Sequence, residues 1–280
     1  MAQRVLSDNK VIRAFIPREE VHIDEHLPEW ARRSNPIVRR HLGAFWKTLP
    51  PDFGVIVRLF GLQVAFVAIS YLIPPLFTVI MPVVTVSLVI LPATLFLYVQ
   101  LLATIGVAGA LSMVDEQRND SLDLLLIIPR PLTHILYSKL AAALWRQAEN
   151  FGLIVFAVTL CSLPLLIIQY DTIFSMEDNP LLMRVGLIMA VGSAVLRILL
   201  EPIMVGALGI LFGAALPARV PAVVATGLIA GSYFAAINML RLLPVDPLVR
   251  LGIETILPLV LPVIITVGAF RLAALVLRRD

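Results

Sequence analysis

Two residues of opposite charge stand inside one long apolar stretch of the sequence. Arg197 and Glu201 are four positions apart, so in a helix they share one face and can form an ion pair. Ionisable side chains at membrane depth are costly, and they commonly mark ion or substrate pathways. The pair is therefore one candidate site, a polar lining within a membrane bundle. The other interpretation, a structural pair beside a kink at Pro202, stays open.

Sequence motifs for catalysis are absent from this chain. It has no Gly-x-x-x-x-Gly-Lys-Ser/Thr phosphate loop and no His-Glu-x-x-His metal motif. The single cysteine, Cys161, lies in an apolar run and is interpreted as a packed hydrophobe. His22 and His26 are four positions apart, but we interpret them as a solvated pair rather than as metal ligands. We therefore expect no catalytic residue, metal site or cofactor in this chain.

A polar stretch between two apolar ones has the most informative pattern. Residues 115–129 read Asp-Glu-Gln-Arg-Asn-Asp-Ser-Leu-Asp-Leu-Leu-Leu-Ile-Ile-Pro. Asp120 or Ser121 can cap a short helix, and acids in its first turn suit the positive end of the helix dipole. Leucines then form an apolar face, and Pro129 ends the helix. We predict a short helix over residues 121–128, in a turn between two membrane spans.

The composition indicates that the surrounding elements are membrane-spanning helices. Of the 280 residues, 59% are hydrophobic and 15% are charged, whereas soluble domains have about 25% charged residues. No Asp, Glu, Lys or Arg occurs from residue 59 to residue 114, a stretch long enough for two spans of about 20 residues each. We predict an all-α membrane protein, a six-span helical bundle with spans at about 54–73, 84–113, 144–170, 182–216, 220–240 and 256–277.

The sequence leaves two details of these spans undecided. The route of residues 76–82 stays open, because an apolar stretch of this length suits either an outer turn or a re-entrant piece. The fourth span is too long for one straight crossing, so we expect an entry helix or a break near Pro202.

Gly209-x-x-x-Gly213 and Gly227-x-x-x-Gly231 allow close approach of helices. We interpret both motifs as packing within one bundle, and a dimer seam is the alternative.

Basic residues near the span ends predict the orientation of the chain. One side has the N-terminal tail and then Arg118, Arg130, Lys139, Arg146, Arg219, Arg278 and Arg279, whereas the other has only Arg184, Arg241 and Arg250. Lys and Arg accumulate on the cytoplasmic side of membrane proteins. We therefore expect a multi-pass protein of the cell (inner) membrane with both termini in the cytoplasm. Because topology explains the net charge of +3, no nucleic-acid partner is expected.

Residues 1–52 form a predicted cytoplasmic tail, and residues 53–280 form the transmembrane domain. In the tail, Asn35 can cap a helix whose first turn begins with Pro36. Apolar residues then recur at helical spacing, accompanied by Arg39, Arg40 and Trp46. We interpret this segment as an amphipathic interfacial helix on the inner leaflet of the lipid membrane. The alternative is a solvated helix packed on a partner.

The stretch from Glu116 to Lys139 resembles the type-2 ABC transporter permease family. Members carry Glu-Arg-Glu-x-Gly-Thr-Leu-Glu-x-Leu-Leu-x-x-Pro between their second and third spans, and a Gly-Lys pair farther on. The identical residues here are Glu116, Leu122, Leu125, Leu126, Pro129 and Lys139. Ser121 and Asp123 are near matches, while Gln117, Arg118, Asp120 and Ser138 depart from the pattern. The segment beginning Asn35-Pro36 is also similar to the family's Asn-Pro-x-x-x-Arg entry helix.

The resemblance implies that residues 121–128 form a coupling helix. This helix would sit in a cleft of a separate ABC ATP-binding subunit and pass nucleotide-driven closure to the spans. ATP and Mg²⁺ would be bound by that subunit, and a second permease copy or a related permease would complete the pathway. The coupling residues would be Glu116, Arg118, Ser121, Leu122, Asp123, Leu125, Leu126, Pro129 and Lys139. The alternative is an amphipathic loop at the membrane surface.

These expectations converge on the transmembrane subunit of an ATP-driven exporter, with two alternatives from other classes. A non-transporting scaffold or assembly subunit predicts that changing Glu116 or Asp123 leaves ATPase coupling untouched. An ion-driven secondary transporter predicts that Arg197 and Glu201 are essential and that no ATPase copurifies with the chain.

Overall fold

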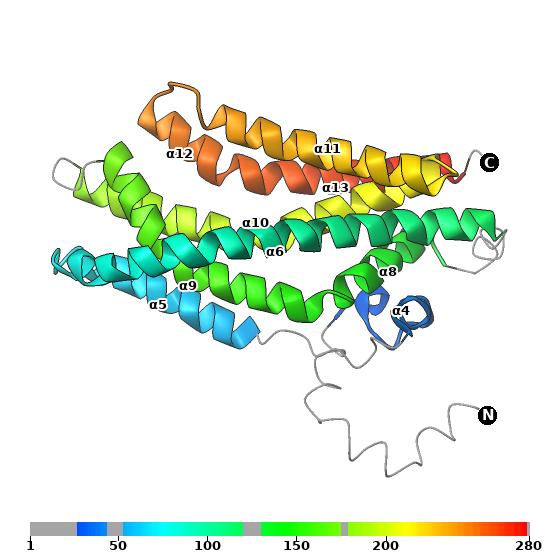
Figure 1. Ribbon diagram of the computed structural model, residues 1–280, viewed down its shortest axis with the longest axis horizontal. Coiled ribbons are helices and arrows are strands. Elements are labelled where there is room, and N and C mark those ends of the chain that lie inside the picture. Colours follow the sequence, from blue (N-terminus) through cyan, green and yellow to red (C-terminus); the bar gives the residue numbers. More distant parts are fainter. Residues whose placement is uncertain (1–26, 44–52, 120–129, 175–178, 279–280) are drawn as a thin grey trace, which may run out of the picture.

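The computed structural model describes residues 27–43, 53–119, 130–174 and 179–278, and all regular elements in these ranges are helices (Figure 1). The prediction of an all-α protein is confirmed. In chain order the elements are η1 (Glu29–Ala31), α4 (Pro36–Leu42), α5 (Phe53–Ile69), α6 (Leu76–Arg118), α8 (Leu132–Trp145), α9 (Ala148–Ile173), α10 (Pro180–Ala215), α11 (Arg219–Leu240), α12 (Pro247–Thr255) and α13 (Leu257–Val276).

Multi-pass membrane character is clear from helix length and composition. Five helical stretches in the described part of the chain are long and apolar enough to cross a membrane: Pro82–Arg118, Ala148–Ile173, Pro180–Ala215, Arg219–Leu240 and Pro247–Val276. The expected first span corresponds to α5, which is apolar but has only 17 residues. At 1.5 Å per residue it is about 26 Å long, somewhat less than a bilayer core. The described part of the chain therefore has five helical stretches suited to crossing a membrane, and a sixth span stays a prediction.

Two long helices are continuous where the sequence suggested interruptions. Residues 76–82 form the first turns of α6, a single helix of 43 residues, so this segment is neither an outer turn nor a re-entrant piece. The expected break near Pro202 is wrong, because α10 continues through it as a helix of 36 residues. Proline removes one backbone hydrogen bond. Pro202 is buried where α10 packs on its neighbours, and that packing keeps the helix continuous.

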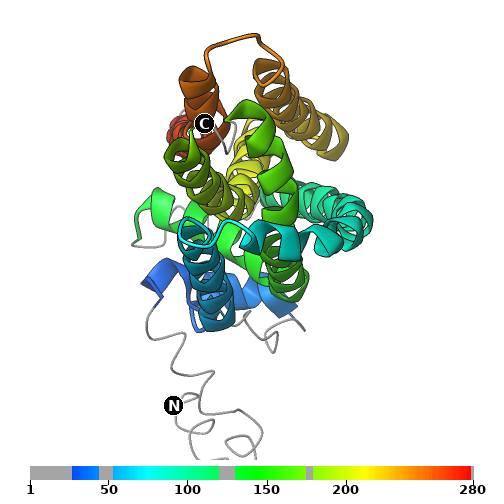
Figure 2. The ribbon, with the colours of Figure 1, turned by 90° about the vertical axis from the view of Figure 1, so that its left-hand side faces the viewer.

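Helix α10 lies at the centre of the bundle, with α6, α9, α11 and α13 around it (Figure 2). Glycines allow α6 and α10 to touch through their backbones. A Cβ atom added at Gly209 would lie 2.3 Å from the Gly106 carbonyl oxygen, and one at Gly213 would lie 2.3 Å from the Ala110 oxygen. The first glycine motif therefore packs within the bundle, as predicted. The second does not, because Gly227 and Gly231 have no atom within 4 Å of an added Cβ.

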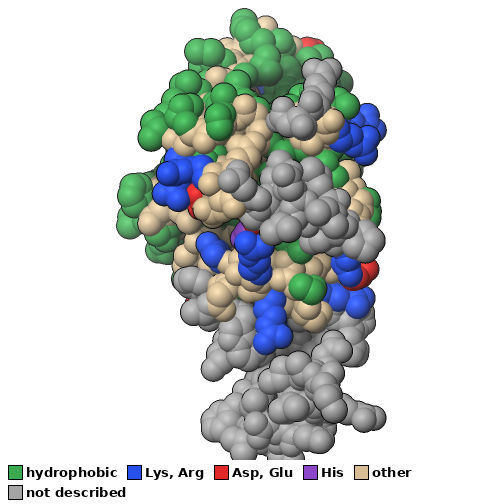
Figure 3. Space-filling view, turned by 90° about the vertical axis from the view of Figure 1, so that its right-hand side faces the viewer, with side chains coloured by type: hydrophobic (Ala, Val, Ile, Leu, Met, Phe, Trp, Pro, Cys, Tyr) green, Lys and Arg blue, Asp and Glu red, His purple; other side chains and the backbone are tan. Residues whose placement is uncertain are grey.

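Helices α4, α8, the C-terminal end of α6 and the C-terminal end of α13 lie at one end of the long axis (Figure 1). Helix α12 and the start of α10 lie at the other end. Seen end-on, the first end shows many Lys and Arg side chains and few acidic ones (Figure 3). This end, called the basic end below, includes the candidate site.

Candidate functional site

Helix α4 is defined at both ends by its sequence. The Asn35 side chain accepts a hydrogen bond from the Ile37 backbone N–H at 3.0 Å, and Pro36 occupies the first turn, as predicted. Gly43 ends the helix with a φ of +55°, in the left-handed region that favours glycine. A capped helix of only 7 residues is still marginal alone. Its position therefore depends on what its apolar face contacts.

The apolar face of α4 packs on α8 rather than facing lipid. Val38 and Leu42 are 0% and 1% exposed, and they form one cluster with Ala141 and Ala142 of α8. Val38 and Leu42 are therefore covered by protein rather than by lipid, and the location of α4 at the inner leaflet stays a prediction. The alternative, a helix packed on a partner, describes it, and the partner is part of the same chain. Arg39 and Arg40 are exposed on the opposite face, whereas Trp46 lies outside the described residues.

A hydrogen-bond chain ties the start of α4 to α8. The Asn35 amide donates to the Ser138 hydroxyl at 3.1 Å and to the Glu29 carbonyl oxygen at 3.2 Å. The Ser138 hydroxyl in turn donates to the His134 carbonyl oxygen at 2.8 Å. Ser138 stands where the permease pattern has glycine. Its hydroxyl gives this chain a contact with α4 that a glycine could not make.

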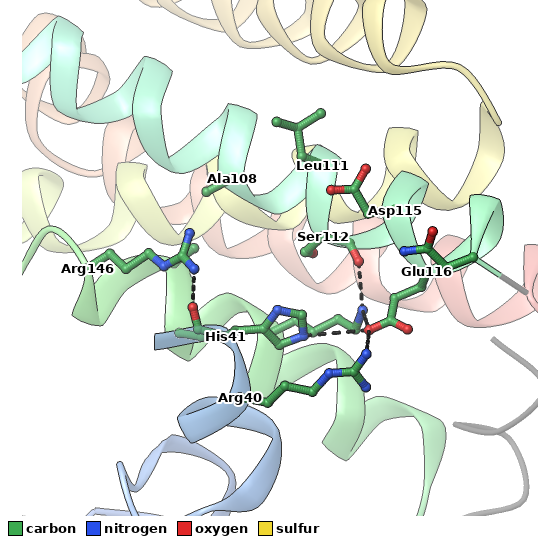
Figure 4. Close-up of a pocket in the computed structure, with 12 residues that line it drawn as sticks. Arg40, His41, Ala108, Leu111, Ser112, Asp115, Glu116 and Arg146 are labelled. Atoms are coloured by element: carbon green, nitrogen blue, oxygen red, sulfur yellow. Dashed lines mark hydrogen bonds and ion pairs between the residues drawn. The ribbon is translucent and has the colours of Figure 1, made fainter. Parts of the chain in front are cut away.

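Glu116 is the centre of the candidate site (Figure 4). It lies in the last turns of α6 with only 4% of its side chain exposed. The ammonium group of Lys139 on α8 lies 3.4 Å from Glu116 Oε1 and donates to the Ser112 carbonyl oxygen at 2.8 Å. From α4, His41 Nε2 approaches the same carboxylate oxygen to 3.8 Å and Arg40 Nη2 approaches it to 3.9 Å. One buried carboxylate thus joins α4, α6 and α8.

Burial sets the protonation of the groups around Glu116. Desolvation lowers the pKa of Lys139 to about 8, with the Glu116 carboxylate acting in the opposite direction. Desolvation and the neighbouring Lys139 charge lower the pKa of His41 to about 4. At pH 7 Lys139 is therefore mostly charged, and His41 is neutral. The site can hold α4 in place and tie α6 to α8.

A cavity of about 360 Å³ lies over these residues, between α6, α8 and the end of α4. Charged and polar side chains form much of its lining, including Arg40, His41, Asp115 and Arg146. The Arg146 guanidinium donates to the His41 carbonyl oxygen, which closes one side. Asp115 points away from Glu116 (Figure 4) and pairs with Arg219 at 2.7 Å, linking α6 to the start of α11.

The remaining predicted coupling residues lie within, or directly before, a segment that the structure does not describe. Ser121, Leu122, Asp123, Leu125, Leu126 and Pro129 lie outside the described residues. Arg118 is exposed in the last turn of α6, immediately before this segment. The segment's flanking helices, α6 and α8, meet through Glu116 and Lys139 at the basic end. The two helices that flank the segment are therefore joined to each other.

The other predicted polar site forms deeper in the bundle. Arg197 Nε donates to Glu201 Oε1 at 2.8 Å, so the predicted pairing of these residues is confirmed. The Tyr98 hydroxyl of α6 donates to Glu201 Oε2 at 2.6 Å, and the Tyr233 hydroxyl of α11 lies 3.3 Å from Oε1. Glu201 is 2% exposed. The cluster joins α6, α10 and α11, and each of these helices supplies a hydrogen-bond donor to the Glu201 carboxylate.

Sequence reasoning missed several members of these two clusters. His41 and Ser112 had no motif to mark them, and only the folded chain brings them to Glu116 and Lys139. Tyr98 and Tyr233 had a usable signal, since a tyrosine in an apolar span needs a partner for its hydroxyl. An acid in a neighbouring span is the natural acceptor.

Comparisons with protein-family models, with curated proteins and with solved structures find no match for this chain. What the protein does is therefore inferred from its own residues and geometry.

Proposed function

We propose that this chain is the transmembrane subunit of an ATP-driven exporter. It has six spans, with α5 as the first, and its basic end faces the cytoplasm of the cell (inner) membrane. Residues 121–128, which lie outside the described residues, are the coupling segment that docks on a separate ATP-binding subunit. A second permease copy or a related permease completes the pathway.

The observation that supports this proposal best is that three segments which resemble the permease family contact one another in the fold. The Asn35–Pro36 entry helix, Glu116 and Lys139 are far apart in the sequence, and in the fold they contact one another. A chance match to a linear pattern would not require such contacts. A functional unit would, because each part helps to hold the two ends of the coupling segment.

The geometry suggests how force on the coupling segment reaches the spans. Helices α6 and α8 flank the segment and are joined by the buried pair of Glu116 and Lys139. Force on residues 121–128 therefore acts on both helices as one body. Helix α6 touches α10 through the backbone at Gly209 and Gly213, so a displacement of α6 must also move or slide along the central helix.

The orientation is supported by the distribution of charge. The basic end includes Arg39, Arg40, Arg118, Arg146 and Arg219, and Figure 3 shows this excess of positive side chains. Positively charged residues favour the cytoplasmic side. An ATP-binding subunit in the cytoplasm could reach residues 121–128 only at this end.

The buried carboxylate gives the ion-driven alternative little support. An ion-coupling acid needs access to water during its cycle. Glu201 is 2% exposed and is satisfied by Arg197 and two tyrosines, an arrangement suited to holding α6, α10 and α11 together.

Copurification tests the proposal. The tagged chain is isolated in mild detergent, and the bound proteins are identified and assayed for ATP hydrolysis. We expect an ATP-binding protein with the wild-type chain and its loss with Leu125→Asp. Leu242→Asp is the matched control, because Leu242 is 83% exposed in the loop after α11, at the end opposite the basic end. If no ATPase is recovered, or if both variants retain it equally, the proposal is wrong.

A further inference from the structure

Two more cavities extend the candidate site along α6. One of about 360 Å³ adjoins the Glu116 cavity, sharing Ala108, Ala143 and Arg146 with it. The next, of about 320 Å³, shares Thr104, Gln147 and Asn150 with the second. The shared walls make them one groove between α6 and the junction of α8 with α9.

The groove changes in character along its length. At the basic end its walls include Arg40, Lys139 and Arg146. The middle has Gln147, Asn150 and Thr104, and the far part adds Leu97, Leu101, Leu153 and Ile154. Leu101 and Ile154 are buried, whereas Leu153 is 60% exposed and Leu97 is 42% exposed, so these two leucines form the open apolar surface.

This change coincides with the expected membrane boundary. Helix α9 has 26 residues, about 39 Å, which spans a hydrocarbon core of about 30 Å with its ends in the interfaces. If α9 is centred in the bilayer, its start at Ala148 is at the lipid headgroup level. The middle of the groove faces the headgroups, and the leucines face the acyl chains.

Most charges on the groove walls are already paired. Glu116 is matched by Lys139 and Arg40, and Asp115 is matched by Arg219. The exceptions on these walls are Arg146 and Glu149, which both line the middle cavity. Neither forms an ion pair with a residue in the described part of the chain. A ligand that complements this part needs one negative and one positive group close together.

We propose that this groove binds a zwitterionic phospholipid with a primary ammonium headgroup, a phosphatidylethanolamine. Its phosphate pairs with Arg146, its ammonium pairs with Glu149, and one acyl chain lies over Leu97 and Leu153. The amides of Gln147 and Asn150 offer further hydrogen bonds. This inference rests on membrane insertion alone and does not depend on coupling to an ATPase.

The lining also distinguishes a primary ammonium from choline. Quaternary ammonium groups are typically recognised by aromatic cages. The walls of the three cavities include no Phe, Tyr or Trp among the residues that the structure describes. A primary ammonium instead donates hydrogen bonds, which a carboxylate and amide oxygens accept.

Lipid titration followed by native mass spectrometry tests the proposal on the full chain in detergent. Dioleoyl phosphatidylethanolamine, phosphatidylcholine and phosphatidylglycerol are compared on the wild type, Glu149→Gln, Arg146→Gln and the control Arg39→Gln. Arg39 is exposed on α4 and does not line the groove. Since Arg146 also bonds to α4, Glu149→Gln on the exposed surface is the variant that decides.

We expect phosphatidylethanolamine to bind about tenfold more tightly than phosphatidylcholine, the effect of one charge-assisted hydrogen bond. Glu149→Gln should remove this preference, Arg146→Gln should weaken both lipids, and Arg39→Gln should change neither. Equal binding of the two zwitterionic lipids by the wild type would overturn the proposal. So would a preference for phosphatidylglycerol, or a phosphatidylethanolamine preference that survives in Glu149→Gln.

Discussion

Replacing Glu116 by glutamine tests whether one buried carboxylate holds α4, α6 and α8 together. The substitution keeps the shape of the side chain and removes its charge. Lys139, whose side chain is 0% exposed, then loses the carboxylate with which it pairs among the described residues. Breaking a buried ion pair from one side costs about 3–5 kcal/mol.

The pKa of Lys139 sets which end of that range applies. It is already lowered to about 8, and the Glu116 carboxylate is the main group that raises it. Without Glu116 the pKa of Lys139 falls further, so the lysine can lose its proton near pH 7. This deprotonation costs about 1.4 kcal/mol for each unit by which the pKa of Lys139 still exceeds the pH. This limits the cost to about 3 kcal/mol. Removing both charges with Glu116→Gln and Lys139→Met should restore most of that loss.

Backbone hydrogen exchange in α8, the helix of Lys139, is the suitable assay, since it reports local opening. A loss of about 3 kcal/mol corresponds to about 100-fold faster exchange. Asp115→Asn is the matched control on the next residue. Its pair with Arg219 is 43% and 55% exposed, so less than about fivefold is expected. Equal effects of the two variants, or a double variant as unstable as Glu116→Gln, would refute the reasoning.

Three further predictions concern helix packing, pH and the buried polar cluster. Gly209→Ala should lower the thermal stability of the purified chain by about 2 kcal/mol, because its Cβ would lie 2.3 Å from a backbone oxygen of α6. Gly227→Ala, the control, should be neutral. Similar losses in the two variants would contradict the packing of α6 on α10. Docking of α4 should weaken as pH falls from 6.5 toward 4: the pKa of His41 is lowered to about 4, so the undocked state binds more protons in this window. Hydrogen exchange in α4, corrected for its intrinsic pH dependence, should show this loss, and His41→Gln should abolish it. Tyr98→Phe should cost about 2 kcal/mol in thermal unfolding by removing a 2.6 Å hydrogen bond to Glu201, and no loss would count against a structural role for this cluster.

Local sequence patterns predicted the helices well where one physical requirement dominates. The fifth predicted span, 220–240, agrees with α11 at Arg219–Leu240, because an apolar length bounded by charged and turn residues is specified locally. The cap at Asn35 was predicted for the same reason. The expected break at Pro202 failed because neighbouring helices, which the local sequence does not reveal, keep α10 continuous.

The surroundings of the site could be predicted only in part. Amphipathicity showed that α4 has an apolar face, but lipid and α8 satisfy such a face equally well. The resemblance marked Glu116 and Lys139 separately, while their 3.4 Å contact depends on how α6 and α8 pack. The role of His41 likewise arises from tertiary structure. Long-range contacts of this kind are set by the whole bundle rather than by a local pattern.

The central claim, that residues 121–128 engage a nucleotide-driven partner, is tested most directly by site-specific photo-crosslinking in intact cells. A photoreactive residue replaces Leu125, and the adducts are identified by mass spectrometry, with the same residue at Leu242 as control. Our account predicts a crosslink from position 125 to a cytoplasmic ATP-binding protein, increased or decreased when ATP is depleted, and none from position 242. Adducts from position 125 with lipid alone, or with a protein on the opposite side of the membrane, would contradict it.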